Sequence, residues 1–197
     1  MAVAPEIIFS AYAVSGVDPS GVRHLDQPDA SGFSFIKNPS TAPGAFLNFG
    51  QINITQGKQT TPTLAVIARL GELNDMTESV FNMRFWLPDL ADFQIGTFKF
   101  NGFASGTWIP SVNLTEASGK FVSTALPSGQ NLFRNADPNQ IFNANDLFQK
   151  ELTASGTVDD QVTQYVFLSV TVDQDAAVKQ YGGDGGGFTY RLTYDFK

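Results

Sequence analysis

The sequence predicts an all-β protein: an antiparallel β-sandwich of immunoglobulin-like or jelly-roll type, with long loops and at most one short helix. Apolar and polar residues alternate along several short segments, as in half-buried strands, while long stretches of helical periodicity are nearly absent. Turn signals such as Asn101-Gly102 and Ser118-Gly119 separate these segments. About seven or eight strands at this spacing are typical of two packed antiparallel sheets.

The first strands are expected, in chain order, at Ile7–Val14, Phe46–Ile52, Thr63–Leu70, Ser79–Leu87, Ile95–Phe103 and around Trp108–Leu114. The fourth shows the alternation most fully. It places Phe81, Met83, Phe85 and Leu87 on one face and Val80, Asn82, Arg84 and Trp86 on the other.

Two further strands are expected near the C-terminus. The last carries an apolar face made of Phe188, Tyr190, Leu192, Tyr194 and Phe196. These side chains are predicted to point into the core, because a slip of one residue would exchange them for Thr, Arg and Asp. In residues 162–172 one parity carries valines and Leu168, while the other carries Tyr165 and Phe167 among Thr and Ser, which predicts a central strand covered on both faces. Residues 188–196 are expected to be its hairpin partner.

Two long stretches do not fit the strand pattern. Residues 15–45 are rich in Pro-containing turns and are predicted to form an extended loop or arm. The apolar residues of this arm are expected to serve as assembly contacts; they are Val22, Leu25, Phe33, Phe35 and Ile36. Residues 126–150 also lack alternation, and Asp137 followed by Pro138 favours the start of one short helix there.

Size and charge exclude several classes of protein. A chain of 197 residues predicts a single domain over 1–197 that can bury its own core. Cysteine is absent, which excludes disulfides and thiol chemistry. The net charge of -7 argues against direct nucleic-acid binding. No apolar run approaches the roughly 20 residues that span a bilayer, so no membrane partner is expected and synthesis in the cytoplasm is predicted.

The sequence contains no motif that predicts catalysis. His24 is the only histidine, and it lies in the Pro-rich stretch without a G-x-S-x-G motif anywhere in the chain. The Gly-rich run at 182–187 lacks the Lys-Ser/Thr pair of a phosphate-binding loop. We therefore expect a protein that is not an enzyme and that has no cofactor.

A bound calcium ion is the alternative to a protein that binds no metal. Asn135, Asp137, Asn139 and Asp146 have the spacing of oxygen ligands in a calcium loop, but Gln140 replaces the expected glycine, so a helix cap is favoured. Asp173, Asp175 and Asp184 flank the last predicted hairpin loop and form a second candidate group. Trp86 and Trp108 could supply a sugar-stacking platform, which keeps a carbohydrate-binding module as another alternative.

Two segments carry a family resemblance. Leu47-Asn-Phe-Gly-Gln-Ile-Asn-Ile-Thr-Gln-Gly57 resembles the opening of immunoglobulin-like modules of bacteriophage virion decoration and appendage proteins. The ending from Gln180 to Phe196 is similar to the last hairpin of such subunits and of pilin-like sandwiches. The resemblance implies a structural subunit of a virion, in the capsid decoration, cement, tail or appendage, whose partners are copies of itself or capsid and tail proteins. A secreted, extracellular pilin-like filament or adhesin subunit is the alternative.

Overall fold

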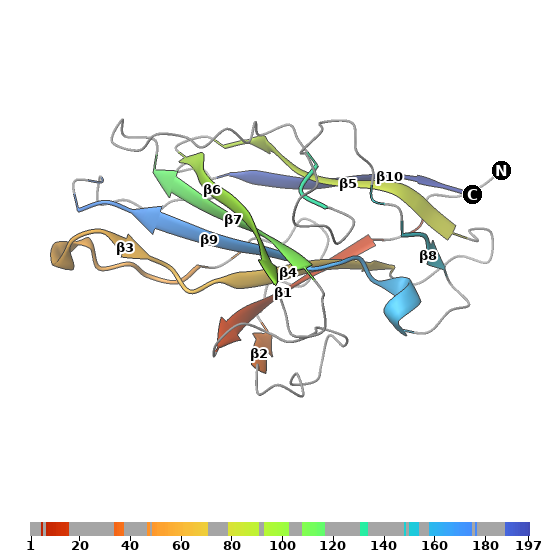
Figure 1. Ribbon diagram of the computed structural model, residues 1–197, viewed down its shortest axis with the longest axis horizontal. Coiled ribbons are helices and arrows are strands. Elements are labelled where there is room, and N and C mark those ends of the chain that lie inside the picture. The colour runs from red at the N-terminus through yellow and green to blue at the C-terminus, as the bar shows by residue number, and fades with distance from the viewer. Residues whose placement is uncertain are drawn as a thin grey trace.

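The computed structural model describes residues 5, 7–15, 34–37, 47, 49–70, 79–90, 93–102, 108–116, 131–133, 148, 150–153, 158–174, 176 and 188–197 (Figure 1). These residues form β-strands and two 3-10 turns, η1 (Ile54–Gln56) and η2 (Val158–Gln161), with no α-helix among them. The β-rich class predicted from the sequence is thus confirmed. The helix predicted to begin at Asp137 lies outside the described residues.

The larger sheet has the strand order β2-β1-β4-β9-β7-β6, with β3 pairing with β9 beside this path. Its strands are β1 (Ile7–Ser15), β2 (Ser34–Lys37), β3 (Gln59–Thr60), β4 (Leu64–Leu70), β6 (Phe93–Gly102), β7 (Trp108–Glu116) and β9 (Val166–Val172). The expectation of purely antiparallel sheets was wrong, since β7 and β9 pair in parallel. The reason is topological: between β7 and β9 the chain forms β8 in the other sheet and returns as a parallel neighbour.

The smaller sheet is antiparallel, with β10 (Thr189–Phe196), β5 (Ser79–Asp89) and β8 (Leu152–Thr153) in that order. The predicted hairpin between the last two strands was wrong, because β10 pairs with β5 and not with β9. β9 is the central strand that the sequence predicted, and β4 and β7 occupy both of its edges. The apolar face of β10 instead continues that of β5, with Leu192 opposite Phe85.

Both sheets contribute to one hydrophobic core (Figure 1). The ring of Phe9 in β1 lies 6.0 Å from that of Phe85 in β5 and 5.0 Å from that of Tyr190 in β10. The apolar residues of the last strand pack against this core, as predicted, but are only half buried; they are Phe188, Tyr190, Leu192, Tyr194 and Phe196. Among the described residues β10 is an edge strand and has a neighbouring strand, β5, on one side only.

An irregularity in β5 corrects the predicted faces of that strand. Asn82 has φ 52°, and two residues of β5 stand against one of β10 between the Phe81–Asp195 and Arg84–Thr193 pairs. This bulge reverses the alternation, so Val80 is buried in the core while Phe81 is half exposed. The prediction was right beyond the bulge, where Met83, Phe85 and Leu87 face the core.

Short or irregular segments account for the other differences. The predicted strand at Phe46–Ile52 was wrong, because its described residues have no strand geometry; Gly50 adopts φ 80°, while Phe49 and Ile52 still pack on the core. β3 and β8 were not predicted, since two residues are too few to show alternation. β2 lies within the predicted arm at 15–45 and pairs with β1. Ser15 is the last residue of β1, and residues 16–33 and 38–45 lie outside the described residues.

Two threonines close the pairing of β4 with β9. Between the Thr60–Thr171 and Leu64–Leu168 pairs, three residues stand against two, and the Thr61 hydroxyl accepts from the Val170 N–H at 3.0 Å. Beyond the Val66–Val166 pair, the extra residue lies on the opposite side of the ladder, in the segment that precedes β9. There the Thr163 hydroxyl accepts a hydrogen bond from the Ala68 N–H at 3.0 Å. Each side chain thus satisfies a buried donor at an irregularity of the ladder.

Candidate functional site

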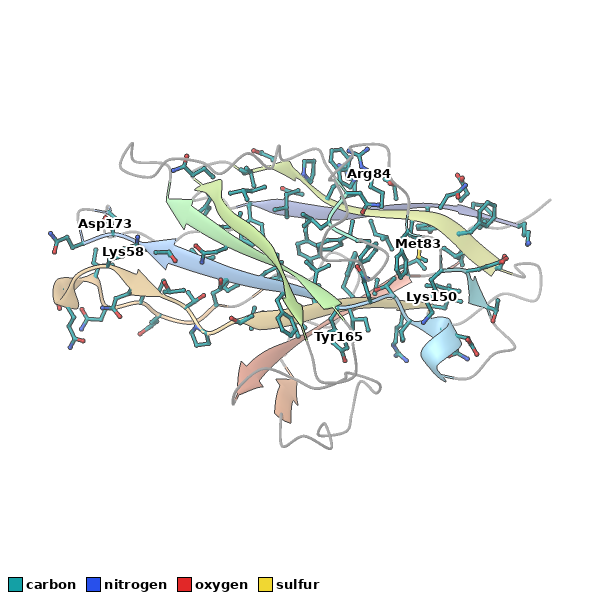
Figure 2. The ribbon with its side chains drawn as sticks, viewed as in Figure 1. Lys58, Met83, Arg84, Lys150, Tyr165 and Asp173 are labelled. Atoms are coloured by element: carbon teal, nitrogen blue, oxygen red, sulfur yellow. The ribbon has the colours of Figure 1, made fainter. Side chains whose placement is uncertain are left out.

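A group of three side chains lies on the outer face of the smaller sheet. Arg84 and Trp86 alternate with the core residues of β5, and Arg191 of β10 is paired directly opposite Trp86. Figure 2 shows Arg84 and Met83 on opposite sides of β5, with Met83 toward the core. We name Arg84, Trp86 and Arg191 the arginine–tryptophan cluster.

Both guanidinium groups of this cluster lie close to the same indole ring, that of Trp86. The Cζ atom of Arg84 lies 4.5 Å from the centroid of the Trp86 ring, and that of Arg191 lies 5.7 Å from it. Both distances fall within the range of cation–π attraction. Neither guanidinium has a carboxylate partner in the described part of the chain. The cluster is therefore locally basic on a chain whose net charge is -7.

Two donors of the cluster are buried without an acceptor. Arg84 Nε and the indole N–H of Trp86 are shielded from solvent and form no hydrogen bond with any residue that the structure describes. A buried donor without a partner costs about 1–3 kcal/mol, more when it is charged. Because both atoms are donors and sit among positive charges, the group that would satisfy this site is an acceptor, and an anionic one by preference.

The bulge at Asn82 gives the cluster its orientation. By reversing the alternation of β5, it turns Met83 inward and places Arg84 and Trp86 on the outer face. The Asn82 side chain donates to Asp195 Oδ2 of β10 at 2.7 Å. Asn tolerates positive φ better than most residues, and this hydrogen bond fixes the bulge to the neighbouring strand.

An ion pair closes the far end of the same sheet. Lys197 Nζ lies 3.0 Å from Glu151 Oε1, and it also lies 5.8 Å from the centroid of the Phe81 ring. The adjacent Ser79 hydroxyl and Lys197 lower the pKa of Glu151, although Ser79 Oγ does not reach full hydrogen-bond geometry. Lys197 is thus already paired, unlike the two arginines of the cluster.

The outer face of the larger sheet carries polar groups that satisfy one another. Asn113 Nδ2 donates to Ser169 Oγ at 2.9 Å and to Thr171 Oγ1 at 3.0 Å, and the Thr60 and Thr171 hydroxyls lie 2.8 Å apart. The same face also buries Tyr165 and Phe167. This network needs no external partner, so the arginine–tryptophan cluster is the better candidate site.

The calcium candidates fall mostly outside the described residues; those outside are Asn135, Asp137, Asn139, Asp146, Asp175 and Asp184. Asp173 is described, and its Oδ1 accepts from the Gln174 N–H at 2.7 Å in a turn. Within the described ranges no three metal-ligating side chains come together.

The remaining predicted residues are placed as follows. His24, Val22, Leu25 and Phe33 lie outside the described residues, whereas Phe35 and Ile36 lie in β2, opposite Val14 and Ala13 of β1. Trp86 and Trp108 belong to different sheets, which does not favour a shared sugar-stacking platform.

Sequence reasoning did not find the arginine–tryptophan cluster. Arg84 and Trp86 were recognised as neighbours on one face of a strand, and Arg191 as part of the polar face of the last strand. What joins them is the pairing of β10 with β5, between strands about 100 residues apart in the chain. The available signal was an Arg on the polar face of each of two amphipathic strands.

Comparisons with known proteins add no identity. Searches of protein-family models, curated proteins and solved structures returned no match. In the described part of the chain, no helix has the length and apolarity required to cross a membrane.

Proposed function

We propose that this chain is a non-enzymatic structural subunit of a homo-oligomeric assembly, and that the outer face of its smaller sheet docks against a neighbouring subunit. The observation that carries the proposal is the arginine–tryptophan cluster, in which neither guanidinium has a carboxylate partner and neither buried donor has an acceptor among the residues that the structure describes. A neighbouring subunit supplies carboxylates to the guanidinium groups of the cluster, of which Arg191 is exposed.

The chemistry of the cluster supports a protein interface. Arg and Trp are enriched in protein–protein interfaces and among the residues that dominate binding energy. The chain carries 19 acidic residues against 12 basic ones, so another copy is rich in carboxylates that complement Arg84 and Arg191. A surface of this kind binds a partner and needs no catalytic residues.

The finer assignment follows the sequence resemblance. Two facing sheets with a common core support a sandwich of immunoglobulin-like or jelly-roll type. We propose a bacteriophage virion component, a decoration, cement, tail or appendage protein, as the class of subunit. The outer face of the smaller sheet is then the surface through which copies contact one another.

The test is the oligomeric state of the full chain. Sedimentation velocity and light scattering should show concentration-dependent oligomers of the wild-type protein. Arg84→Gln and Trp86→Phe, which remove a charge and the indole donor, should each shift the population toward monomer. Arg69→Gln is the matched control, because Arg69 is exposed on the larger sheet. A wild-type protein that is monomeric throughout, or an equal loss in all three variants, would overturn the proposal.

A further inference from the structure

β10 forms one edge of the smaller sheet, and in the described residues only β5 pairs with it. Ser79 and Lys197 exchange both backbone hydrogen bonds, at 3.2 and 3.1 Å. Because the N–H and C=O groups of a strand alternate in direction, Arg191, Thr193 and Asp195 also point theirs toward β5. Leu192 and Tyr194 therefore point theirs away from the sheet, where they can pair with another strand.

The sequence of this edge is complementary to itself. When Arg191-Leu-Thr-Tyr-Asp195 is placed antiparallel to a second copy about Thr193, Arg191 of each copy lies opposite Asp195 of the other. We propose that two copies of the chain associate edge to edge in this register, β10 against β10, and so join their smaller sheets into one continuous sheet.

The directions in which the backbone N–H and C=O groups of β10 point agree with this register. Leu192 of one copy faces Tyr194 of the second, and these are the residues whose backbone groups point outward. Arg191 and Asp195 then form the pairs without mutual backbone hydrogen bonds, in which side chains of antiparallel strands approach most closely. The side chains of Arg191, Thr193 and Asp195 all lie on the outer face of the sheet and are exposed.

Neighbouring registers that would allow the same pattern of backbone hydrogen bonds do not pair opposite charges in this way. Centring the pair on Leu192 places Arg191 opposite Thr193, which leaves the charge unpaired. Centring it on Tyr194 places Arg191 opposite Lys197, which sets two positive charges against each other. Charge therefore selects the register centred on Thr193.

Both faces of the joined sheet gain from this arrangement. On the inner face, Leu192 and Tyr194 are only half buried, and the second copy extends the apolar row beside them. On the outer face, Asp195 of the second copy brings a carboxylate to Arg191, at the margin of the arginine–tryptophan cluster. The inference rests on the proposed function and adds the strand edge and the register through which two copies of the chain pair.

Single cysteines test the register directly, because the chain contains none. Thr193→Cys places two thiols at the symmetry point, where side chains of facing strands lie about 4.5–5.5 Å apart at Cβ. Mild oxidation should convert most of this variant to a covalent dimer. Thr189→Cys is the matched control: Thr189 is also exposed on β10, but its counterpart in the second copy lies roughly 27 Å along the strands.

Charge reversal tests the pairing of Arg191 with Asp195. Arg191→Asp and Asp195→Arg each set like charges opposite one another at two places in the dimer, and each should weaken dimerisation at least about tenfold. The double variant restores opposite charges and should recover most of the wild-type affinity, measured by sedimentation. Thermal unfolding checks that each variant folds, since Asp195 also accepts from Asn82.

The outcomes separate this inference from the proposed function. Oligomers that depend on Arg84 and Trp86, with equal cross-linking at positions 193 and 189, would overturn the edge-to-edge register and leave the assembly role standing. A double variant as weak as its parents would also overturn the register. A wild-type protein that stays monomeric would overturn both.

Discussion

Two antiparallel strand pairs, β4 with β9 in the larger sheet and β5 with β10 in the smaller, differ in how their polar groups are satisfied. In the pairing of β4 with β9, each irregularity is closed by a threonine hydroxyl, Thr61 on one side and Thr163 on the other. In the pairing of β5 with β10, the buried donors of Arg84 and Trp86 on the outer face have no acceptor in the described part of the chain. The first pair therefore satisfies its irregularities with its own side chains, whereas the second does not satisfy these donors with any described residue.

Burial follows the same division. β9 has covered side chains on both faces, with Leu168 fully buried on one and Phe167 3% exposed on the other. β10 alternates between half-buried and exposed residues along its whole length. The central strand therefore supplies stability, and the edge strand supplies surface. Each of the following predictions tests this contrast.

The largest expected difference is between two leucines. Leu168→Ala should lower the free energy of unfolding by about 2–5 kcal/mol, because it leaves a cavity in the core. Leu192→Ala should cost about 1 kcal/mol, because the side chain is only half buried. Urea unfolding measures both. Equal losses would show that β10 is as deeply embedded as β9, contrary to the contrast drawn above.

Asn131 tests the edge of β5 that faces away from β10, where the chain's own residues hydrogen-bond to the backbone of β5. Its buried side chain accepts from the N–H groups of Phe85 and Phe133, both at 3.0 Å, and donates to the Met83 C=O at 3.1 Å. Asn131→Leu keeps the branched shape of the side chain, is somewhat larger and removes these bonds, and it should cost about 2–4 kcal/mol in the same measurement. A loss below about 0.5 kcal/mol, the usual surface value, would mean that this segment does not complete the sheet.

The two threonines that close the β4–β9 ladder should behave alike. Thr61→Val and Thr163→Val each leave one buried N–H without an acceptor, at Val170 and at Ala68, and each should cost about 1–3 kcal/mol. Thr189→Val is the control, since this exposed hydroxyl should change stability by no more than about 0.5 kcal/mol. If the control lost as much as the other two, the effect would belong to threonine in strands generally.

The smallest expected effect is alkaline destabilisation through β10. Burial raises the pKa of Tyr190 above its ordinary value of 10.0. The folded state therefore favours the neutral phenol; this contribution is complete below pH 10 and is lost as the pH rises through the raised pKa. Melting temperatures between pH 9 and 11.5 should fall, and less so in Tyr190→Phe. An identical slope in that variant would show that other groups cause the alkaline loss.

The sequence predicted most of the strands because their residues alternate or are continuously apolar. The central position of β9 followed from apolar residues at both parities, and the inward face of β10 followed from Tyr190, Leu192 and Tyr194. Where the backbone departs from a period of two, the pattern misled. The bulge at Asn82 exchanged the faces of Val80 and Phe81, and no local signal marked it.

The sequence alone specifies most of the longer strands and their apolar faces, because side-chain alternation is a local property of an extended backbone. It also determined the self-complementary order of charge from Arg191 to Asp195. Only the tertiary structure decided that β10 pairs with β5, that Arg191 joins Arg84 at the Trp86 ring, and that β10 lies at an edge. These depend on strand partners far apart in the chain, and such partners are selected by packing of the whole core, which no short pattern encodes.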